Sequence, residues 1–294
     1  MIKLIYDTKD FIDLHDHDKI IYFETNINNK KISLNIPVNK DDIVDLPVKG
    51  SYSFFNFEKR FSLTEIDIII NEFENFLQKN SVQEIRITFP PDNLNNSIKS
   101  FFYIMSVRGW MSGDHDLSSI IDLNQDFRKK FSKSAKNRLN KSLKVEGLNF
   151  KKADNFDDWK KAYDCILKNR QEKGYYLAMS LDQILEMQKF NIKAFILQSV
   201  SVTYSACLVY FHSNNLAQVI YWGSIKEGEE LSLQYRLVYE LFNILNLMGI
   251  SKLDLGSSTK STSFNSGLFD YKTQLGAITS INYKLKFNLN EINN

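Results

Sequence analysis

The 294-residue chain has little cysteine and little proline, with two cysteines and four prolines. Cys165 and Cys207 form no Cys-x-x-Cys pair, which argues against a zinc ribbon and against a secreted domain held by disulfides. No Gly/Ser-rich tract indicates a flexible linker. The length suits two domains that each bury a core, so we expect two domains with a short connection.

Long apolar runs are also missing. None approaches the roughly 20 residues that a membrane-spanning helix needs. The N-terminus becomes acidic at Asp7, before the apolar core of a signal peptide could form. These absences predict a cytoplasmic protein without a membrane span.

The usual signatures of metal and nucleophile chemistry are absent as well. His15 and His17 lie two residues apart in a His-Asp-His-Asp run, and neither His115 nor His212 has ligand-like spacing around it. We interpret the run as a polar turn and expect no metal. A Gly-x-Ser-x-Gly elbow, a P-loop and a Cys-His arrangement are missing, so a covalent nucleophile is not expected.

Charge is divided unevenly along the chain. Residues 1–125 carry 13 Lys/Arg against 19 Asp/Glu, a net of −6, and residues 126–294 carry 24 against 16, a net of +8. An anionic ligand would favour the second half. Random drift of surface charge between domains is the alternative.

Hydrophobic spacing predicts mixed α/β structure in the second half. The three strands near its middle are consecutive, and Ser213-Asn214-Asn215 forms the turn between the last two, which indicates an antiparallel meander. The expected helices are 127–144, about 157–174, 180–190, 232–248 and about 264–275, and the expected strands are 192–200, 203–212, 216–223, 251–256 and 278–287.

The first half has a similar order of elements. Ser62 and Glu65 form a predicted capping box at the start of a helix. Expected strands are 2–6, 18–24, 30–36, 82–89 and 117–123, and expected helices are 62–79 and 97–108. Because the order repeats, we predict two similarly folded α/β (α+β) domains at 1–125 and 126–294, each a mixed, largely antiparallel sheet flanked by helices.

The segment from Leu253 to Ala277 offers the clearest candidate site. A strand ends in Asp254-Leu255-Gly256, and Ser257 and Ser258 follow it. Backbone N–H groups and hydroxyls at such a place can hold an anion. Lys272 could present a point charge to a phosphate or to a polarised carbonyl. The alternative is a loop chosen for its turn residues, with a lysine that faces solvent.

The same segment resembles a signature of the Fem-type peptidoglycan-bridge aminoacyltransferases and of their smaller acyl-CoA-using relatives in the GNAT superfamily. The resemblance extends over about residues 120–285 and implies two tandem GNAT-like domains, the second of which carries the donor site. It rests on Asp254, Gly256, Asn265, Gly267, Leu268, the Tyr271-Lys272 pair and Gly276, and on the basic helix with Arg128, Lys136 and Arg138.

The chain departs from the pattern at three positions. Leu255 replaces the usual aromatic residue, and Leu275 and Ala277 stand where Phe and a second Gly are common. The long charged helical hairpin of several tRNA-dependent members is also missing. Its absence favours an acyl-CoA or acyl carrier protein donor over aminoacyl-tRNA.

The resemblance implies direct attack of an acceptor amine on an acyl carbonyl, without a covalent intermediate. Lys272 matches the family lysine near the donor phosphate and the reacting carbonyl. Asp254 is the predicted base, with Tyr221 and Glu230 as alternatives.

Two further features bear on the donor. In GNAT proteins the loop after the central strand binds the coenzyme pyrophosphate, and here Lys226 and Gly228 stand in that loop beside three glutamates, which disfavour pyrophosphate. The run 128–144 holds eight Lys/Arg and no acid, suited to RNA or a coenzyme 3′-phosphate, or else to a solvated helix face. The predicted donor-binding residues are Lys226, Gly228, Ser257, Ser258, Arg138 and Lys272.

Three functions follow. The leading one is an acyltransferase that uses acyl-CoA or an acyl carrier protein and an amine acceptor, such as an amino sugar of a cell-surface polysaccharide or cell-wall pathway. The second is an aminoacyl-tRNA-dependent Fem-type transferase. The third is a catalytically silent GNAT-like scaffold that binds a partner protein.

Overall fold

The computed structural model describes residues 4–260 and 263–289, and the chain divides into two compact units. The first comprises Met1–Ser118, Ser257–Asn265 and Thr279–Asn294, and the second comprises Ser119–Gly256 and Ser266–Ile278. Each unit combines helices with mostly antiparallel strands, which confirms the predicted fold class.

In the first unit, β1 (Lys19–Ile27), β2 (Lys30–Val38) and β4 (Asn56–Phe57) form an antiparallel sheet. A second sheet pairs β3 (Ile43–Leu46) in parallel and β15 (Ile278–Asn288) antiparallel with β5 (Glu84–Pro91). The remaining elements are α1 (Lys9–Ile12), α2 (Leu63–Lys79), α3 (Ser97–Val107), β6 (Met111–Ser112), the start of β7 (Asp116–Asp122), and the paired β13 (Thr259–Lys260) and β14 (Ser263–Phe264).

Local signals explain where α2 begins. The Ser62 side chain accepts from the N–H of Glu65, and the Glu65 carboxylate accepts from the N–H of Ser62, so the predicted capping box is confirmed. The strand expected at 2–6 is wrong for its described residues, because Ile5–Asp7 form a 3₁₀ helix (η1). Residues 2 and 3 lie outside the described residues.

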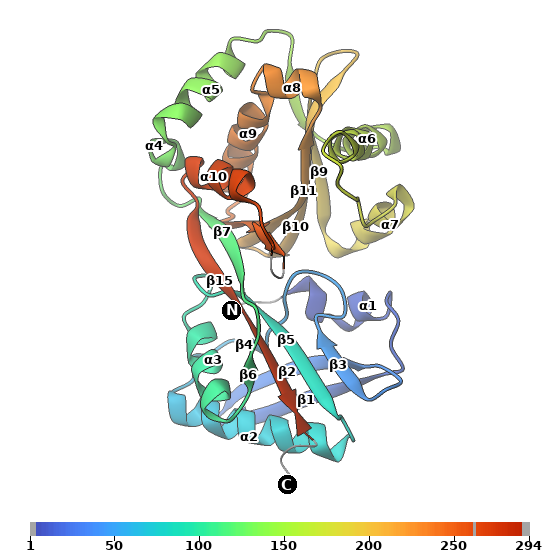
Figure 1. The fold of residues 1–294 in the computed structure, drawn as a ribbon, viewed down its shortest axis with the longest axis vertical. Helices are drawn as coiled ribbons and strands as arrows, with labels where there is room; N and C mark the ends of the chain where they lie inside the picture. Colours follow the sequence, from blue (N-terminus) through green and yellow to red (C-terminus); the bar gives the residue numbers. More distant parts are fainter. Residues whose placement is uncertain (1–3, 261–262, 290–294) are drawn as a thin grey trace. The chain divides into compact units, whose positions relative to one another are not determined.

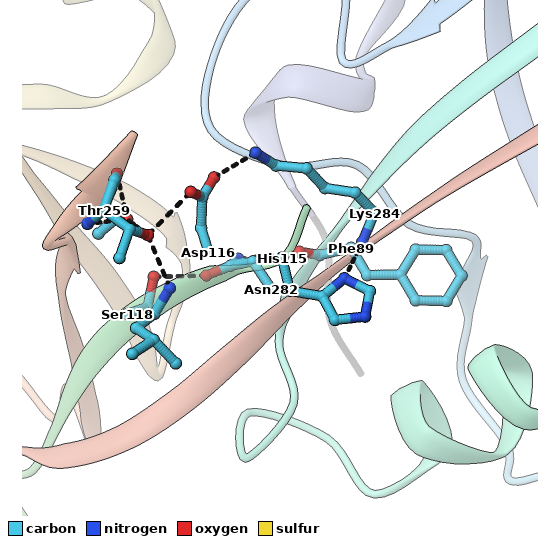
Figure 2. A network of polar contacts seen from close by, with 9 residues as sticks. Phe89, His115, Asp116, Ser118, Thr259, Asn282 and Lys284 are labelled. Carbon is cyan, nitrogen blue, oxygen red and sulfur yellow. Dashed lines mark hydrogen bonds and ion pairs between the residues drawn. The ribbon is translucent and has the colours of Figure 1, made fainter. Parts of the chain in front are cut away.

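A polar network joins three distant segments of the first unit (Figure 2). The Asp116 carboxylate accepts from Thr259 Oγ1 at 2.8 Å and pairs with Lys284 Nζ at 2.7 Å. His115 Nδ1 accepts from the Lys284 N–H at 3.1 Å, so a neutral ring carries its proton on Nε2. Burial, with Lys284 nearby, lowers the pKa of His115 and favours that neutral form.

In the second unit the strand order is β7, β12 (Lys252–Ser257), β11 (Leu216–Ser224), β10 (Thr203–Ser213), β9 (Ile192–Gln198) and β8 (Asn149–Lys152). Strands β9, β10 and β11 pair antiparallel, which confirms the predicted meander. Its helical elements are α4 (Phe127–Lys130), α5 (Lys133–Leu143), α6 (Phe156–Glu172), α7 (Leu181–Glu186), η2 (Met187–Phe190), α8 (Lys226–Glu230), α9 (Leu233–Leu247) and α10 (Ser266–Gln274).

Helices cover both faces of this sheet. Figure 1 shows α6 and α7 on one side of β9–β11, and α5, α9 and α10 on the other. Alternate residues of β10, such as Cys207 and Val209, pack with Leu241 of α9 in one apolar core, as the period of two along a strand requires. Cys165 and Cys207 are both buried, and burial raises the pKa of each thiol.

Two expectations for this unit were wrong. The single helix predicted at 127–144 is two helices, because Phe131 leaves the helical conformation at φ −59° and ψ 136° and the Ser132 side chain then caps α5. The polar loop predicted at 226–230 is the short helix α8. Within the described part of the chain, none of the helices combines the length and the apolar character that crossing a membrane requires.

Candidate functional site

The site begins where two central strands of the second unit stop pairing. β11 and β12 are parallel from Leu216 opposite Lys252 to Gln218 opposite Asp254. Both strands continue beyond this pair, β11 to Ser224 and β12 to Ser257. The register of β11 against β10 also shifts at Ile220, which is an extra residue between the paired positions 219 and 221. Asp254 therefore occupies the last position at which β12 pairs with β11.

Asp254 is fully buried, and both its carboxylate oxygens accept hydrogen bonds. Oδ1 accepts from the N–H of Gly256 at 2.7 Å, and Oδ2 accepts from Nε2 of Gln218 at 3.1 Å. Donors on both oxygens satisfy a buried carboxylate. The arrangement fixes the backbone at Gly256.

Lys272 reaches the same backbone from α10. Its Nζ donates to the carbonyl oxygen of Gly256 at 2.7 Å, and its side chain is 1% exposed. Burial lowers its pKa from 10.5 to about 8, while the Asp254 charge acts in the opposite direction. Lys272 is thus a buried cation near neutral pH and does not face solvent. The structure brings Asp254, Gly256 and Lys272 together.

An aromatic cluster adjoins this lysine. The Tyr271 ring lies 5.4 Å from the Trp222 ring and 5.2 Å from the Tyr235 ring. The exposed Arg138 guanidinium of α5 lies over Tyr235 at 5.6 Å. Tyr235 therefore contacts both Arg138 and Tyr271, the neighbour of Lys272.

Gln218 and His212 extend the polar contacts beyond Asp254, and the sequence analysis did not identify either as a site residue. A carboxylate only accepts, so the Gln218 amide nitrogen faces Asp254 and its oxygen faces His212 Nε2 at 3.1 Å. The ring nitrogen Nε2 must then donate. Burial lowers the pKa of His212 to about 4, so the ring is neutral at pH 7. The sequence signal that could have identified Gln218 is a glutamine within an otherwise apolar strand.

Packing within the protein explains two residues of the segment that was expected to bind pyrophosphate. A Cβ on Gly228 would lie 2.6 Å from the Tyr204 carbonyl oxygen, so close packing of α8 on β10 accounts for this glycine. Glu229 pairs with Lys173 at 2.6 Å and accepts from Asn169 at 3.2 Å. Lys226 is exposed. One of the three glutamates is therefore neutralised by α6 and its neighbour.

The other predicted residues lie elsewhere. Tyr221 is half-buried on β11, with the Arg170 guanidinium 5.6 Å from its ring centre. Ser257 and Ser258 belong to the first unit. Ser257 Oγ donates to the Thr259 carbonyl at 2.8 Å, and the buried Ser258 Oγ has no hydrogen-bond partner among the described residues.

No protein-family profile and no curated protein sequence matches the chain. Solved structures do. FemX superimposes with a TM-score of 0.70 over 93% of this chain and 89% of its own, at 10% identity. L-PGS from Bacillus licheniformis gives 0.59 over 97% and 93%, also at 10% identity. A tandem GNAT protein of the clavulanic acid biosynthesis pathway, determined without AcCoA, gives 0.50 over 95% and 88% at 7% identity.

The chain shares the fold of FemX, L-PGS and the tandem GNAT protein. The likeness extends over nearly the whole chain, which confirms the fold predicted from the motif around Asp254 and Lys272. At identities near 10% it concerns the fold and not the chemistry. Within the described residues, no group of three or more His, Cys, Asp or Glu side chains is arranged to hold a metal ion.

Proposed function

We propose that the protein is an acyltransferase, which moves an acyl group from an acyl-CoA or acyl carrier protein donor to an amine acceptor. One observation carries the proposal: Lys272 is buried and bonded to the Gly256 carbonyl, beyond the position where β11 and β12 stop pairing. A buried cation there can attract a donor phosphate or stabilise negative charge on a reacting carbonyl oxygen. The acceptor we favour is an amino sugar of a cell-surface polysaccharide or cell-wall pathway in the cytoplasm.

The reaction is a direct attack of the amine nitrogen on the acyl carbonyl carbon. The new C–N bond forms as the thioester C–S bond breaks, and the amine proton leaves to a base while the thiolate takes a proton. The predicted base is Asp254, but its two oxygens already accept from Gly256 and Gln218. We therefore assign Asp254 the positioning of Gly256 and Lys272, and we keep Tyr221 and Glu230 as candidates for contact with the acceptor.

Three features support a coenzyme donor. A tandem GNAT protein whose structure was determined without AcCoA shares the fold of this chain. Glu229, which disfavoured a pyrophosphate, is neutralised by Lys173. Lys226 is exposed near the start of α8, and Arg138 is exposed on α5. These cations are available to the phosphates of a coenzyme.

A second candidate is an aminoacyl-tRNA-dependent transferase. FemX and L-PGS are among the similar structures. The two helices α4 and α5 also carry exposed cations, among them Lys129, Lys133 and Arg138. Such a face suits an RNA backbone.

The deciding experiment measures coenzyme A and bulk tRNA binding to the purified protein. For a coenzyme donor we expect a thermal shift of roughly 5 °C at a hundredfold excess of coenzyme A over its Kd. In Lys272→Met the side chain stays unbranched and loses its charge, so the variant should abolish the shift. Lys168→Met, at an exposed position on α6, should retain it. Circular dichroism of both variants excludes unfolding as the cause.

The tRNA arm separates the second candidate. Binding through α4 and α5 should weaken on the order of a thousandfold between 50 and 200 mM salt and should be lost when Lys129, Lys133 and Arg138 are all replaced by Gln. Salt-sensitive tRNA retention without coenzyme binding would replace the coenzyme donor by aminoacyl-tRNA. If folded protein binds neither ligand, the silent scaffold stands and the enzymatic proposal is rejected.

A further inference from the structure

The face of the second unit's sheet that α6 covers holds an arginine with no acidic partner among the described residues. Arg170, near the end of α6, is half-buried and lies over two phenol rings, Tyr221 at 5.6 Å and Tyr175 at 6.0 Å from the ring centres. Among residues 4–260 and 263–289, no carboxylate forms an ion pair or hydrogen bond with its guanidinium.

The acids nearest along the chain already have other partners. Glu172 pairs with Lys168 at 4.0 Å, and Glu229 pairs with Lys173 at 2.6 Å. Neither of these acids is paired with Arg170. A guanidinium that lies over aromatic rings keeps its N–H donors for hydrogen bonds, and their planar fork matches a carboxylate or phosphate.

Phenol groups surround the same position. Tyr221 lies near Tyr163 and Tyr176, and the three hydroxyls have no hydrogen-bond partner in the described structure. Burial raises the pKa of Tyr221, so its hydroxyl remains a neutral donor at pH 7. Neutral donors beside a guanidinium suit an anionic oxygen and place no competing negative charge on it.

The cluster lies on the same side of the sheet as Asp254. Tyr210 pairs with Gln218 across β10 and β11, and Leu208, two residues away on β10, pairs with Tyr221, so Gln218 and Tyr221 share a face. Gln218 in turn hydrogen-bonds Asp254. Tyr221 is three residues from Gln218 along β11, about 10 Å at strand spacing. A small acceptor anchored at Arg170 can extend from there toward the end of β12.

We propose that Arg170 and Tyr221 bind the oxyanion, a carboxylate or a phosphate, of the acceptor molecule. That this anion belongs to the acceptor rests on the proposed function, whereas the binding of an anion at Arg170 does not. The site selects acceptors that carry both an amine and an anionic group. Loss of the guanidinium should weaken binding of the anion at least about tenfold, since hydrogen bonds to charged groups are among the strong ones.

The test titrates ¹⁵N-labelled protein with sodium phosphate and, separately, with sodium acetate, and follows the arginine Nε–H resonances. The Arg170 resonance, assigned by its loss in Arg170→Lys, should shift and saturate in the millimolar range. Saturation by phosphate alone identifies a phosphate-bearing acceptor, and saturation by acetate identifies a carboxylate. Arg170→Gln should abolish the effect on neighbouring backbone resonances, Tyr221→Phe should weaken it, and Lys168→Gln, the exposed control on the same helix, should leave it unchanged.

An unmoved Arg170 resonance up to about 50 mM of either anion, or equal backbone shifts in Arg170→Gln, would overturn the inference. Coenzyme A binding measured on the same samples separates the two proposals, since Arg170→Gln should retain it. Coenzyme binding without anion binding rejects only the acceptor site. Anion binding without any donor binding keeps the site and rejects the acyltransferase.

Discussion

Lys272 Nζ donates a 2.7 Å hydrogen bond to the Gly256 carbonyl oxygen, and the N–H of the same Gly256 donates a 2.7 Å bond to Asp254. One peptide segment therefore links a buried cation to a buried anion. The two charges also attract each other, and this attraction opposes the effect of burial on the lysine pKa. Removing either charge alone leaves the other uncompensated in a low-dielectric interior.

A double-mutant cycle should reveal this coupling. Asp254→Asn and Lys272→Met should each lower the free energy of unfolding by about 3 kcal/mol, because each leaves one buried charge unpaired. The double variant should be less destabilised than the sum, with a coupling of at least about 1 kcal/mol in urea denaturation. The same cycle on the exposed pair Lys160–Asp164 of α6 is the control and should give less than about 0.5 kcal/mol. Additivity at the buried pair would contradict the linkage.

Donor binding should depend on pH through Lys272. Its pKa is lowered by burial to about 8, so the ammonium is present below pH 8 and is lost above it. Coenzyme A affinity measured by calorimetry should therefore fall about tenfold or more between pH 7 and pH 9.5. A pH-independent affinity would show that Lys272 does not contact the phosphates.

The same lysine should make the protein more stable as pH rises, whereas its contribution to donor binding falls. Its pKa in the folded protein is below the unfolded value of 10.5. Below pH 8, burial of the charged lysine therefore lowers the free energy of unfolding. This penalty, about 3 kcal/mol by the size of the shift, is relieved as pH rises from 8 to 10.5. The wild type should gain stability relative to Lys272→Met over that interval in urea unfolding. Parallel pH profiles for the two proteins would contradict the shift.

Gly276, which the motif includes, should resist substitution for a steric reason. Its φ is +79°, and a Cβ there would lie 2.6 Å from Lys130 Cβ and 3.1 Å from the Lys130 carbonyl oxygen. Gly147 has a similar φ of +71° with open space around it. Gly147→Ala should cost about 1 kcal/mol from backbone strain alone. Gly276→Ala should cost at least about 2 kcal/mol more because the end of α4 at Lys130 must move. Equal melting temperatures for the two variants would remove the packing argument.

The sequence predicted the elements whose signals are local. The capping box at Ser62 and the meander of β9–β11 are where the pattern placed them. The division of 127–144 into two helices was not predictable from spacing, because Phe131 keeps the apolar period while its backbone leaves the helix. Short strands such as β3 and β4 were missed, since two to four residues carry little periodicity.

The candidate site was predicted only in part. Asp254 and Lys272 could be found because they lie in one recognisable motif, and the structure brings them to the same peptide segment. Gln218 and Arg170 could not be found in this way, because their contacts join positions separated by 36 and 51 residues in sequence. Such pairs depend on strand register and on how α6 packs, which no local pattern specifies.

The first unit should show a pH-dependent stability that arises from Asp7. Its carboxylate accepts from the Ser53 hydroxyl and from the Phe54 N–H at 3.0 Å, yet burial raises its pKa from 3.8 to about 7. The folded state therefore keeps a proton that the unfolded chain releases between pH 4 and pH 7. Stability from this group is highest near pH 4 and falls as pH rises through 7.

Replacing the carboxyl group should remove that dependence. Asp7→Asn should gain stability relative to the wild type as pH rises from 4 to 8, by up to about 4 kcal/mol according to the size of the shift. Hydrogen-exchange mass spectrometry during urea unfolding, read on peptides of β2 and of residues 50–57, localises the effect to the first unit. Asp10→Asn, an exposed carboxylate on α1, is the control and should follow the wild type. If Asp7→Asn also follows the wild type at every pH, the Asp7 carboxyl group does not hold its proton into the neutral range.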